Sequence, residues 1–307
     1  MNWKPCAFAQ AELLEQALFS SATIHQPHAL KSYLAAQYLY DELQDDALWA
    51  QTATLIQYSE FKHHHLFDVT QSNIQFSAQR RKNILRRGVY PASYLVLWQW
   101  YKQDGFENIV DYYLKQAAQQ NQYLSHDVTL LLAFSELYPR LDVQHIPAFM
   151  QRVTEFITVS FKQEYQETMP DAVDHIEDEK LLQDCLQQPS FFGHNLITLA
   201  WFLRAEAERP TFLIQKLKHN LYVQATTPLE DTEDELDVAL FEQCQDVGAK
   251  TFLALLHELI FQYAHNLHQI TLADALLYLA QRYPHKISEF QQFVLYQTKQ
   301  CAAALAR

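Results

Sequence analysis

The chain has 307 residues and a formal net charge of −13, and it contains only 4 glycines where average usage would give about 21. A loop that cradles phosphate needs several glycines within a few residues, so an ordinary Rossmann dehydrogenase, P-loop NTPase or α/β-hydrolase is excluded. The acidic charge argues against nucleic acid and anionic membrane surfaces as main partners.

Apolar residues recur at spacings of three and four along most of the chain, a pattern typical of helices. Prolines stand between the periodic segments, and the best strand signal, at residues 222–224, is weak. The expected helices cover residues 7–20, 27–42, 45–62, 71–87, 91–103, 105–121, 126–138, 145–165, 177–187, 194–207, 211–220, 235–246, 248–266, 271–282 and 286–305. The sequence therefore predicts an all-α, bundle-like fold of roughly 13–15 helices. Because no linker rich in Pro, Ser or Gly divides the chain, we expect one domain over residues 1–307.

Composition predicts a large core and indicates a cellular compartment. Hydrophobic residues make up 49% of the chain and aromatic residues 13%, which is enough for a large, filled core. The four cysteines lie far apart, without the paired spacing of a metal or redox site. The N-terminus has no apolar signal core, and no apolar run reaches the length of a membrane span. We therefore expect a soluble, cytoplasmic protein that does not bind membranes or nucleic acid.

Four charged or histidine-rich runs are expected at the surface. Residues 79–87 (QRRKNILRR) carry five cations at helical spacing, which favours a solvated helix face over a phosphate site. The acidic stretches 171–180 and 230–237 are expected to form exposed loops or helix starts. Residues 62–65 (KHHH) are expected to end a helix, where consecutive side chains point in different directions and cannot all meet one ion.

Two histidines occur in similar segments at the start of apolar helices. Residues 125–133 (SHDVTLLLA) and 267–276 (LHQITLADAL) share the pattern His-x-(Ile/Val)-Thr-Leu-x-x-Ala around His126 and His268. Residues 271–274 fit the capping box that begins a helix. The repeated placement indicates that these two histidines occupy equivalent positions in the fold.

Two more histidines also lie at or just before the start of an apolar helix. His25 lies in residues 24–30 (IHQPHAL), and His194 lies in residues 192–200 (FGHNLITLA). A helix N-terminus holds a side chain rigidly and lowers the pKa of a histidine, so that the neutral imidazole can bind a metal. Each histidine alone would fit a helix cap equally well, but four placed alike favour a shared metal or acid–base site. We expect His25 and His268 to lie close together.

A fifth candidate lies in the expected helix 248–266. Lys250 and His257 are seven residues apart and share a face of this helix, and apolar neighbours predict that His257 points inward. Glu258 would face elsewhere. A hydrogen-bonded core histidine would give the same pattern. The candidate metal ligands are thus His25, His126, His194, His257 and His268, with Lys250 as a candidate catalytic group.

Three of these segments resemble the questin oxidase-like family, an all-helical group linked to oxidative cleavage of polyketide-type aromatic rings. Residues 25–30 (HQPHAL) resemble its His-x-Pro-Met-Ala-Leu segment, with His28 in place of the methionine. Residues 192–197 (FGHNLI) resemble its helix with Phe, His and Leu-Ile, and residues 267–276 its Leu-His-x-Val-Thr-x-x-x-Ala-Leu stretch. The resemblance implies a non-haem metal, iron before zinc, held largely by histidines and used with molecular oxygen.

The predicted function is a metal-dependent oxidoreductase or oxygenase that uses O₂ on an aromatic or other apolar organic substrate. An apolar, aromatic interior would exclude water and bind a flat molecule. The lack of a nucleotide fingerprint fits an enzyme without a tightly bound flavin and leaves NADPH open as a co-substrate. Two alternatives stay open: a helical scaffold or partner-binding protein without catalysis, and a metal-dependent hydrolase or zinc-stabilised helical protein.

Overall fold

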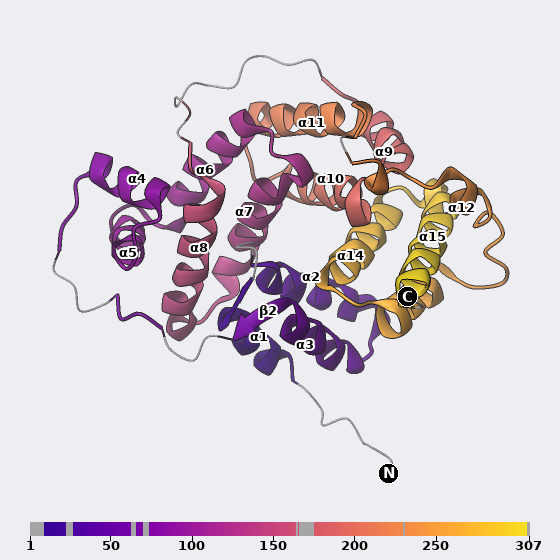
Figure 1. Cartoon of the computed structure of the whole chain (residues 1–307), viewed down its shortest axis with the longest axis horizontal. Coiled ribbons are helices and arrows are strands. Elements are labelled where there is room, and N and C mark those ends of the chain that lie inside the picture. Colours follow the sequence, from indigo (N-terminus) through magenta and orange to yellow (C-terminus); the bar gives the residue numbers. More distant parts are fainter. Residues whose placement is uncertain are drawn as a thin grey trace, which may run out of the picture.

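The computed structural model describes residues 9–22, 27–62, 66–69, 74–163, 165, 175–229 and 231–305. Within these ranges the chain forms fifteen α-helices, several short 3-10 turns and one two-stranded sheet (Figure 1). The predicted all-α fold and the predicted number of helices are confirmed. The helices are α1 (Gln10–Leu18), α2 (His28–Leu43), α3 (Ala47–Ser59), α4 (Ala78–Arg87), α5 (Ala92–Asp104), α6 (Phe106–Gln120), α7 (His126–Leu137), α8 (Ile146–Ser160), α9 (Asp178–Gln187), α10 (His194–Ala205), α11 (Thr211–Thr226), α12 (Val238–Glu242), α13 (Phe252–Glu258), α14 (Leu267–Arg282) and α15 (Ile287–Leu305).

Most departures from the sequence prediction are at helix ends. The weak strand signal at 222–224 is wrong, because α11 continues through these residues and ends just before Pro228. The expected helix 248–266 is shorter and divided: α13 begins after Thr251, whose hydroxyl accepts from the backbone N–H of Ala254, and a π-helical turn follows at Leu259–Tyr263. Such turns accommodate one extra residue within a helix.

Four helices form the centre of the molecule. Helix α2 packs against α7 and α14, and α10 packs against the same two helices. Figure 1 shows them between α4 and α5 at one end and α12 and α15 towards the other. Helix α10 buries every residue except Arg204, and a helix that is apolar all round belongs in a core. Side chains at the ends of these four helices are therefore held by the most buried part of the fold.

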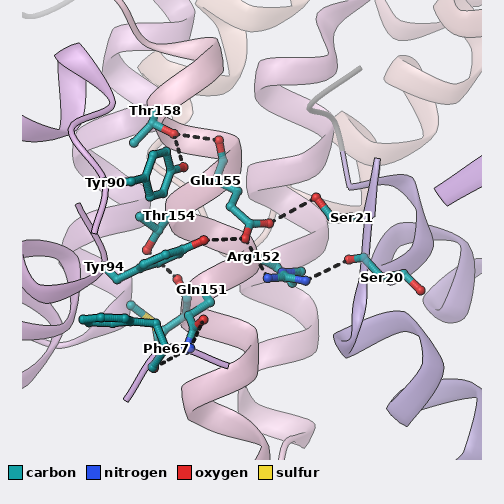
Figure 2. Close-up of polar contacts among 11 residues, drawn as sticks. Ser20, Ser21, Phe67, Tyr90, Tyr94, Gln151, Arg152, Thr154, Glu155 and Thr158 are labelled. Carbon is teal, nitrogen blue, oxygen red and sulfur yellow. Dashed lines mark hydrogen bonds and ion pairs between the residues drawn. The ribbon is translucent and has the colours of Figure 1, made fainter. Parts of the chain in front are cut away.

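The short sheet, which the sequence did not predict, is tied to α8 by a buried polar cluster that we call the arginine network (Figure 2). Strands β1 (Ser20–Ala22) and β2 (Glu60–Lys62) pair antiparallel. In the network, Arg152 Nη2 lies 2.6 Å from Glu155 Oε1, and Arg152 Nη1 donates to the Ser20 carbonyl at 3.3 Å. Tyr94 donates its hydroxyl to Glu155 Oε1 at 2.8 Å, and Ser21 donates to Oε2 at 3.3 Å. The network thereby fixes the position of β1 and, through it, of β2.

The prediction that the charged segments form solvated surfaces is only partly correct. Arg81 is 8% exposed, because its guanidinium lies over the Trp100 ring and donates to Gln103. Lys82 lies over the ring of Tyr112, with its Nζ 4.4 Å from the centroid. Residues 63–65 and 171–174 lie outside the described residues. Among the helices that the structure describes, none has the length and apolar character needed to cross a membrane.

Candidate metal centre

Four histidines from the first turns of the four central helices come together, and we call them the histidine cluster. They are His28 of α2, His126 of α7, His194 of α10 and His268 of α14. One ring nitrogen each from His28, His126 and His268 lie within 4.8 Å of one another. Nε2 of His194 lies 3.0 Å from Nε2 of His126, and the rings of His194 and His268 have centroids 4.8 Å apart. Imidazole nitrogens grouped in this way can hold one transition-metal ion.

The start of α2 is fixed by a buried glutamate. Glu60 of β2 is 8% exposed, and its Oε1 accepts from the backbone N–H of Ala29 at 2.8 Å, one residue after His28. Burial raises the pKa of Glu60 to about 8, while its hydrogen bonds from the helix start act in the opposite direction. Because β2 pairs with β1, the arginine network indirectly supports the position of His28.

Tight turns with unusual backbone angles lead into α7 and α10. Ser125, which precedes His126, has φ 50°, and Gly193, which precedes His194, has φ 76°. Phe192 is also left-handed, with φ 47°. Residues other than glycine adopt this conformation at a cost, and such residues are concentrated at functional sites. The two turns bring the chain back sharply, so that each histidine is the first residue of its helix.

The start of α14 lies earlier than the sequence indicated. Asn266 caps the helix by accepting from the backbone N–H of His268 at 2.8 Å, and Gln269 completes the capping box by accepting from the N–H of Asn266 at 2.9 Å. The predicted capping box at 271–274 is wrong, because Thr271 donates to the His268 carbonyl and Asp274 pairs with Arg204. His268 is thus held in the first helical turn.

Burial favours the neutral form of three histidines of the cluster, His126, His194 and His268. Burial lowers the pKa of His268 to about 3, with Lys31 adding to the effect. Burial also lowers the pKa of His126 and of His194 well below the usual value, and the neighbouring histidines and Lys31 lower both further. Neutral imidazole is the form that binds metals, so these ligands need not lose a proton first.

Hydrogen bonding directs the lone pair of His194. His194 donates its Nδ1–H to the Phe191 carbonyl, which can only accept, so Nε2 of this neutral ring carries the lone pair facing His126. A backbone carbonyl fixes the orientation of many metal-binding histidines in this way. Nε2 of His268 is buried and has no hydrogen-bond partner among the described residues. Such a nitrogen is costly to bury unless something binds it.

A buried lysine lies beside the histidine cluster. Lys31, one turn after His28 on α2, is 1% exposed and donates from Nζ to Thr129 Oγ1 at 3.1 Å. Burial lowers the pKa of Lys31 to about 7, against the opposing charge of Asp274. Asp274 itself is held by both terminal nitrogens of Arg204, at 2.6 and 2.8 Å. The amine of Lys31 can therefore gain or lose a proton near neutral pH.

The structure brings together three of the five predicted ligands, namely His126, His194 and His268. The expectation that His257 points inward is wrong: its side chain is 47% exposed, and its Nε2 lies 3.0 Å from a carboxylate oxygen of Asp45. Lys250 is 51% exposed and pairs with Glu258, the residue that was expected to face elsewhere. Lys250 precedes the N-cap Thr251 and so lies outside α13, whereas His257 lies on the exposed face of that helix, which buries Phe252, Leu255 and Leu256. His25 lies outside the described residues.

Sequence reasoning did not identify two residues of the site, His28 and Lys31. Pro27 is the N-cap of α2, so that His28 becomes the first helical residue, equivalent to His126 and His194. This proline was the available signal, because proline favours positions at helix starts. For Lys31 the signal was weaker: a lone cation in the otherwise apolar segment 29–36 (ALKSYLAA).

Comparison with known proteins gives no relative: no protein-family model, no curated protein and no solved structure matches the chain. The chemistry of the site is therefore inferred from its geometry. The described residues contain one group of three or more His, Cys, Asp or Glu side chains placed to hold a metal, and it is the group of His28, His126 and His268.

Proposed function

We propose that the histidine cluster is the metal centre of an oxidoreductase that uses non-haem iron and O₂ on an aromatic or other apolar organic substrate. The observation that carries the proposal is the convergence of four imidazoles, three of them on buried residues, with the buried Nε2 of His268 lacking a partner in the described structure. The resemblance of three segments to the questin oxidase-like family implies the same chemistry.

In this proposal His28, His126 and His268 supply ligand nitrogens, and His194 presents its Nε2 lone pair beside them. Iron held by these imidazoles would supply the capacity to activate O₂. Four helix N-termini surround the histidine cluster, and their positive ends make the site favourable for negative charge. Lys31 Nζ can hold or release a proton there. The rings of Phe191 and Phe192 lie against His194 and His268 and exclude water.

Zinc is the second candidate, because the group of ligands contains no carboxylate and three histidines also form catalytic zinc sites. A zinc centre would support hydrolysis rather than oxidation. The electrons needed to reduce O₂ would come from the organic substrate or from NADPH. Loss of NADPH absorbance in the presence of O₂ distinguishes these two sources.

The decisive test is metal analysis of protein purified without a histidine tag, after growth with iron, zinc and manganese. We expect close to one equivalent of iron per chain. His268→Ala should lower bound iron at least tenfold while leaving the far-ultraviolet circular dichroism unchanged, because a ligand carries much of the metal affinity but little of the helical packing. His257→Ala is the matched control, since His257 is an exposed histidine, and it should retain the metal.

The results have distinct consequences. One equivalent of zinc with the same dependence on His268 would replace the oxidoreductase by the zinc alternative. Protein that binds no transition metal after anaerobic reconstitution with Fe(II), or a His268→Ala variant that retains full occupancy, would refute a metal centre at these residues.

A further inference from the structure

A cleft of about 430 Å³ opens next to the histidine cluster. Its walls come from the turn Phe191–Gly193, the segment at residues 231–236 and the C-terminal half of α15. Clefts that bind small organic molecules generally have volumes of about 300–1,000 Å³. The cleft is therefore large enough for a ligand about the size of one or two aromatic rings.

Two aromatic side chains separate the cleft from the histidines. Phe191 and Phe192 both line the cleft. Phe192 stacks on His268 with ring centroids 5.5 Å apart and planes at 16°, and Phe191 stacks on His194 at 5.9 Å and 17°. A molecule in the cleft would thus lie one aromatic layer away from the proposed metal centre, with an apolar face available to pack against.

The charge of the cleft is one-sided. Asp231, Asp234 and Glu235 line it together with one histidine, His265, and none of its described lining residues is a lysine or arginine. Asp234 accepts a hydrogen bond from the hydroxyl of Tyr123 at 2.9 Å, which holds this carboxylate in place. Carboxylates grouped along one side of a cleft attract a cation and form charge-assisted hydrogen bonds with an ammonium group.

A buried amide points to the same kind of ligand. Gln297 of α15 lines the cleft and is 3% exposed, and its Oε1 has no hydrogen-bond partner among the described residues. An amide oxygen can only accept, so the missing partner must be a donor. The Tyr296 hydroxyl nearby accepts from Gln300 at 2.6 Å and from the backbone N–H of Asp237 at 3.1 Å, and it does not serve as the donor to Gln297 Oε1.

We propose that this cleft binds an organic amine with an aromatic body. The ammonium group would pair with Asp231, Asp234 and Glu235, an N–H or O–H would donate to Gln297 Oε1, and the aromatic body would pack on Phe191 and Phe192. That the bound amine is also the substrate rests on the proposed function; its binding to the cleft does not.

The test uses three probes with the same phenol ring: tyramine, the uncharged 4-ethylphenol and the anionic 3-(4-hydroxyphenyl)propionate. Calorimetric titration of the full chain should give a Kd for tyramine at least tenfold lower than for 4-ethylphenol, and weaker binding still for the propionate. Asp231→Asn combined with Glu235→Gln should remove most of this preference, since both positions are exposed and their replacement spares the core. Gln297→Leu should weaken tyramine at least fivefold.

Glu242→Gln is the matched control, because it removes one exposed carboxylate of α12 that does not line the cleft, and it should leave tyramine binding unchanged. Equal affinity for tyramine and 4-ethylphenol, or an unchanged preference in the Asp231→Asn/Glu235→Gln variant, would overturn the proposal. The titrations are made with metal-free and iron-loaded protein. Tyramine binding that persists without metal supports the cleft even if metal analysis refutes the metal centre, so the two proposals fail independently.

Discussion

The arginine network and the histidine cluster are both buried and polar, but their groups are satisfied differently. In the arginine network, Arg152 meets the opposite charge of Glu155 at 2.6 Å, and hydroxyl groups donate to the same carboxylate (Figure 2). In the histidine cluster, like groups face one another: the Nε2 atoms of His126 and His194 are 3.0 Å apart, and the cation beside them is Lys31.

The difference indicates what each cluster is for. In the arginine network the cation and the carboxylate meet directly, although Arg152 Nε has no hydrogen-bond partner among the described residues, and the pair connects parts of the chain that are far apart in sequence. The histidine cluster places imidazoles at the positive ends of four helices, and the buried Nε2 of His268 has no hydrogen-bond partner among the described residues, so a bound species can meet this nitrogen. The arginine network is accordingly structural, whereas the histidine cluster has the character of a binding site.

The largest effect should come from breaking the arginine network. Arg152→Met leaves Glu155, whose side chain is 16% exposed, without its cation, which costs about 3 kcal/mol in the free energy of unfolding. Urea denaturation measures this loss, and metal stoichiometry in the folded protein should stay the same. Arg140→Met is the matched control, because Arg140 and Glu136 form a pair that is 39% and 31% exposed and contributes at most about 1 kcal/mol. Equal losses for both variants would contradict a structural role for the network.

The histidine cluster should respond to metal where the arginine network does not. A ligand present at a hundredfold excess over its Kd stabilises the folded state by about 2.7 kcal/mol. Fe(II) or Zn²⁺ should therefore raise the free energy of unfolding of the wild-type chain and of Arg152→Met by similar amounts, and EDTA should reverse the increase. His268→Ala should show almost none of it. Equal stabilisation of His268→Ala would place the bound metal elsewhere in the protein.

Much of this arrangement follows from local sequence. Helical periodicity and prolines predict the helices, and the positions of His126, His194 and His268 near helix starts follow from short segments around each of them. Local signals are sufficient here because capping and turn residues act within a few positions of the helix end.

The rest depends on packing between distant elements. Whether His257 points inward is decided by the turn Leu259–Tyr263 and by the approach of Asp45, neither of which the periodicity of one helix contains. Lys31 is recognised as part of the site only because α7 and α14 bring Thr129 and Asp274 next to it. The sheet was missed since two strands of three residues carry almost no pattern. The predicted closeness of His25 and His268 stays a prediction.

A smaller effect should come from the glycine that leads into α10. Gly193 is left-handed, and a Cβ added there would lie 2.7 Å from a methyl group of Leu272 on α14, the helix that carries His268. Gly193→Ala should cost about 2 kcal/mol in stability and weaken metal binding, because it pushes apart two helices that present ligands. Gly88→Ala is the control, since Gly88 has a similar φ of 59° and only ordinary contacts around the added atom. It should cost about 1 kcal/mol and leave metal affinity unchanged.

The smallest expected effect is a loss of stability at acidic pH, which tests whether the histidines are neutral in the metal-free protein. The folded-state pKa of His268 is about 3, whereas an exposed histidine titrates near 6.5, so between these values the unfolded chain binds a proton that the folded chain does not. Stability from this residue is therefore fully present above pH 6.5 and is lost as the pH falls towards 3. The limiting slope is about 1.4 kcal/mol per pH unit.

His268→Gln removes this titration while keeping a side chain of similar length. The fall in unfolding free energy of the metal-free protein between pH 6 and pH 5 should thus be smaller in His268→Gln than in the wild type by about 1 kcal/mol. Buried carboxyl groups with raised pKa values, such as Glu60, contribute in the opposite direction, but they are common to both proteins and cancel in the difference. Arg152→Met should keep the wild-type slope, because Arg152 does not titrate in this range. An identical slope in His268→Gln and the wild type would mean that His268 is protonated in the folded protein, and the histidine cluster would then lack the neutral bases that a metal requires.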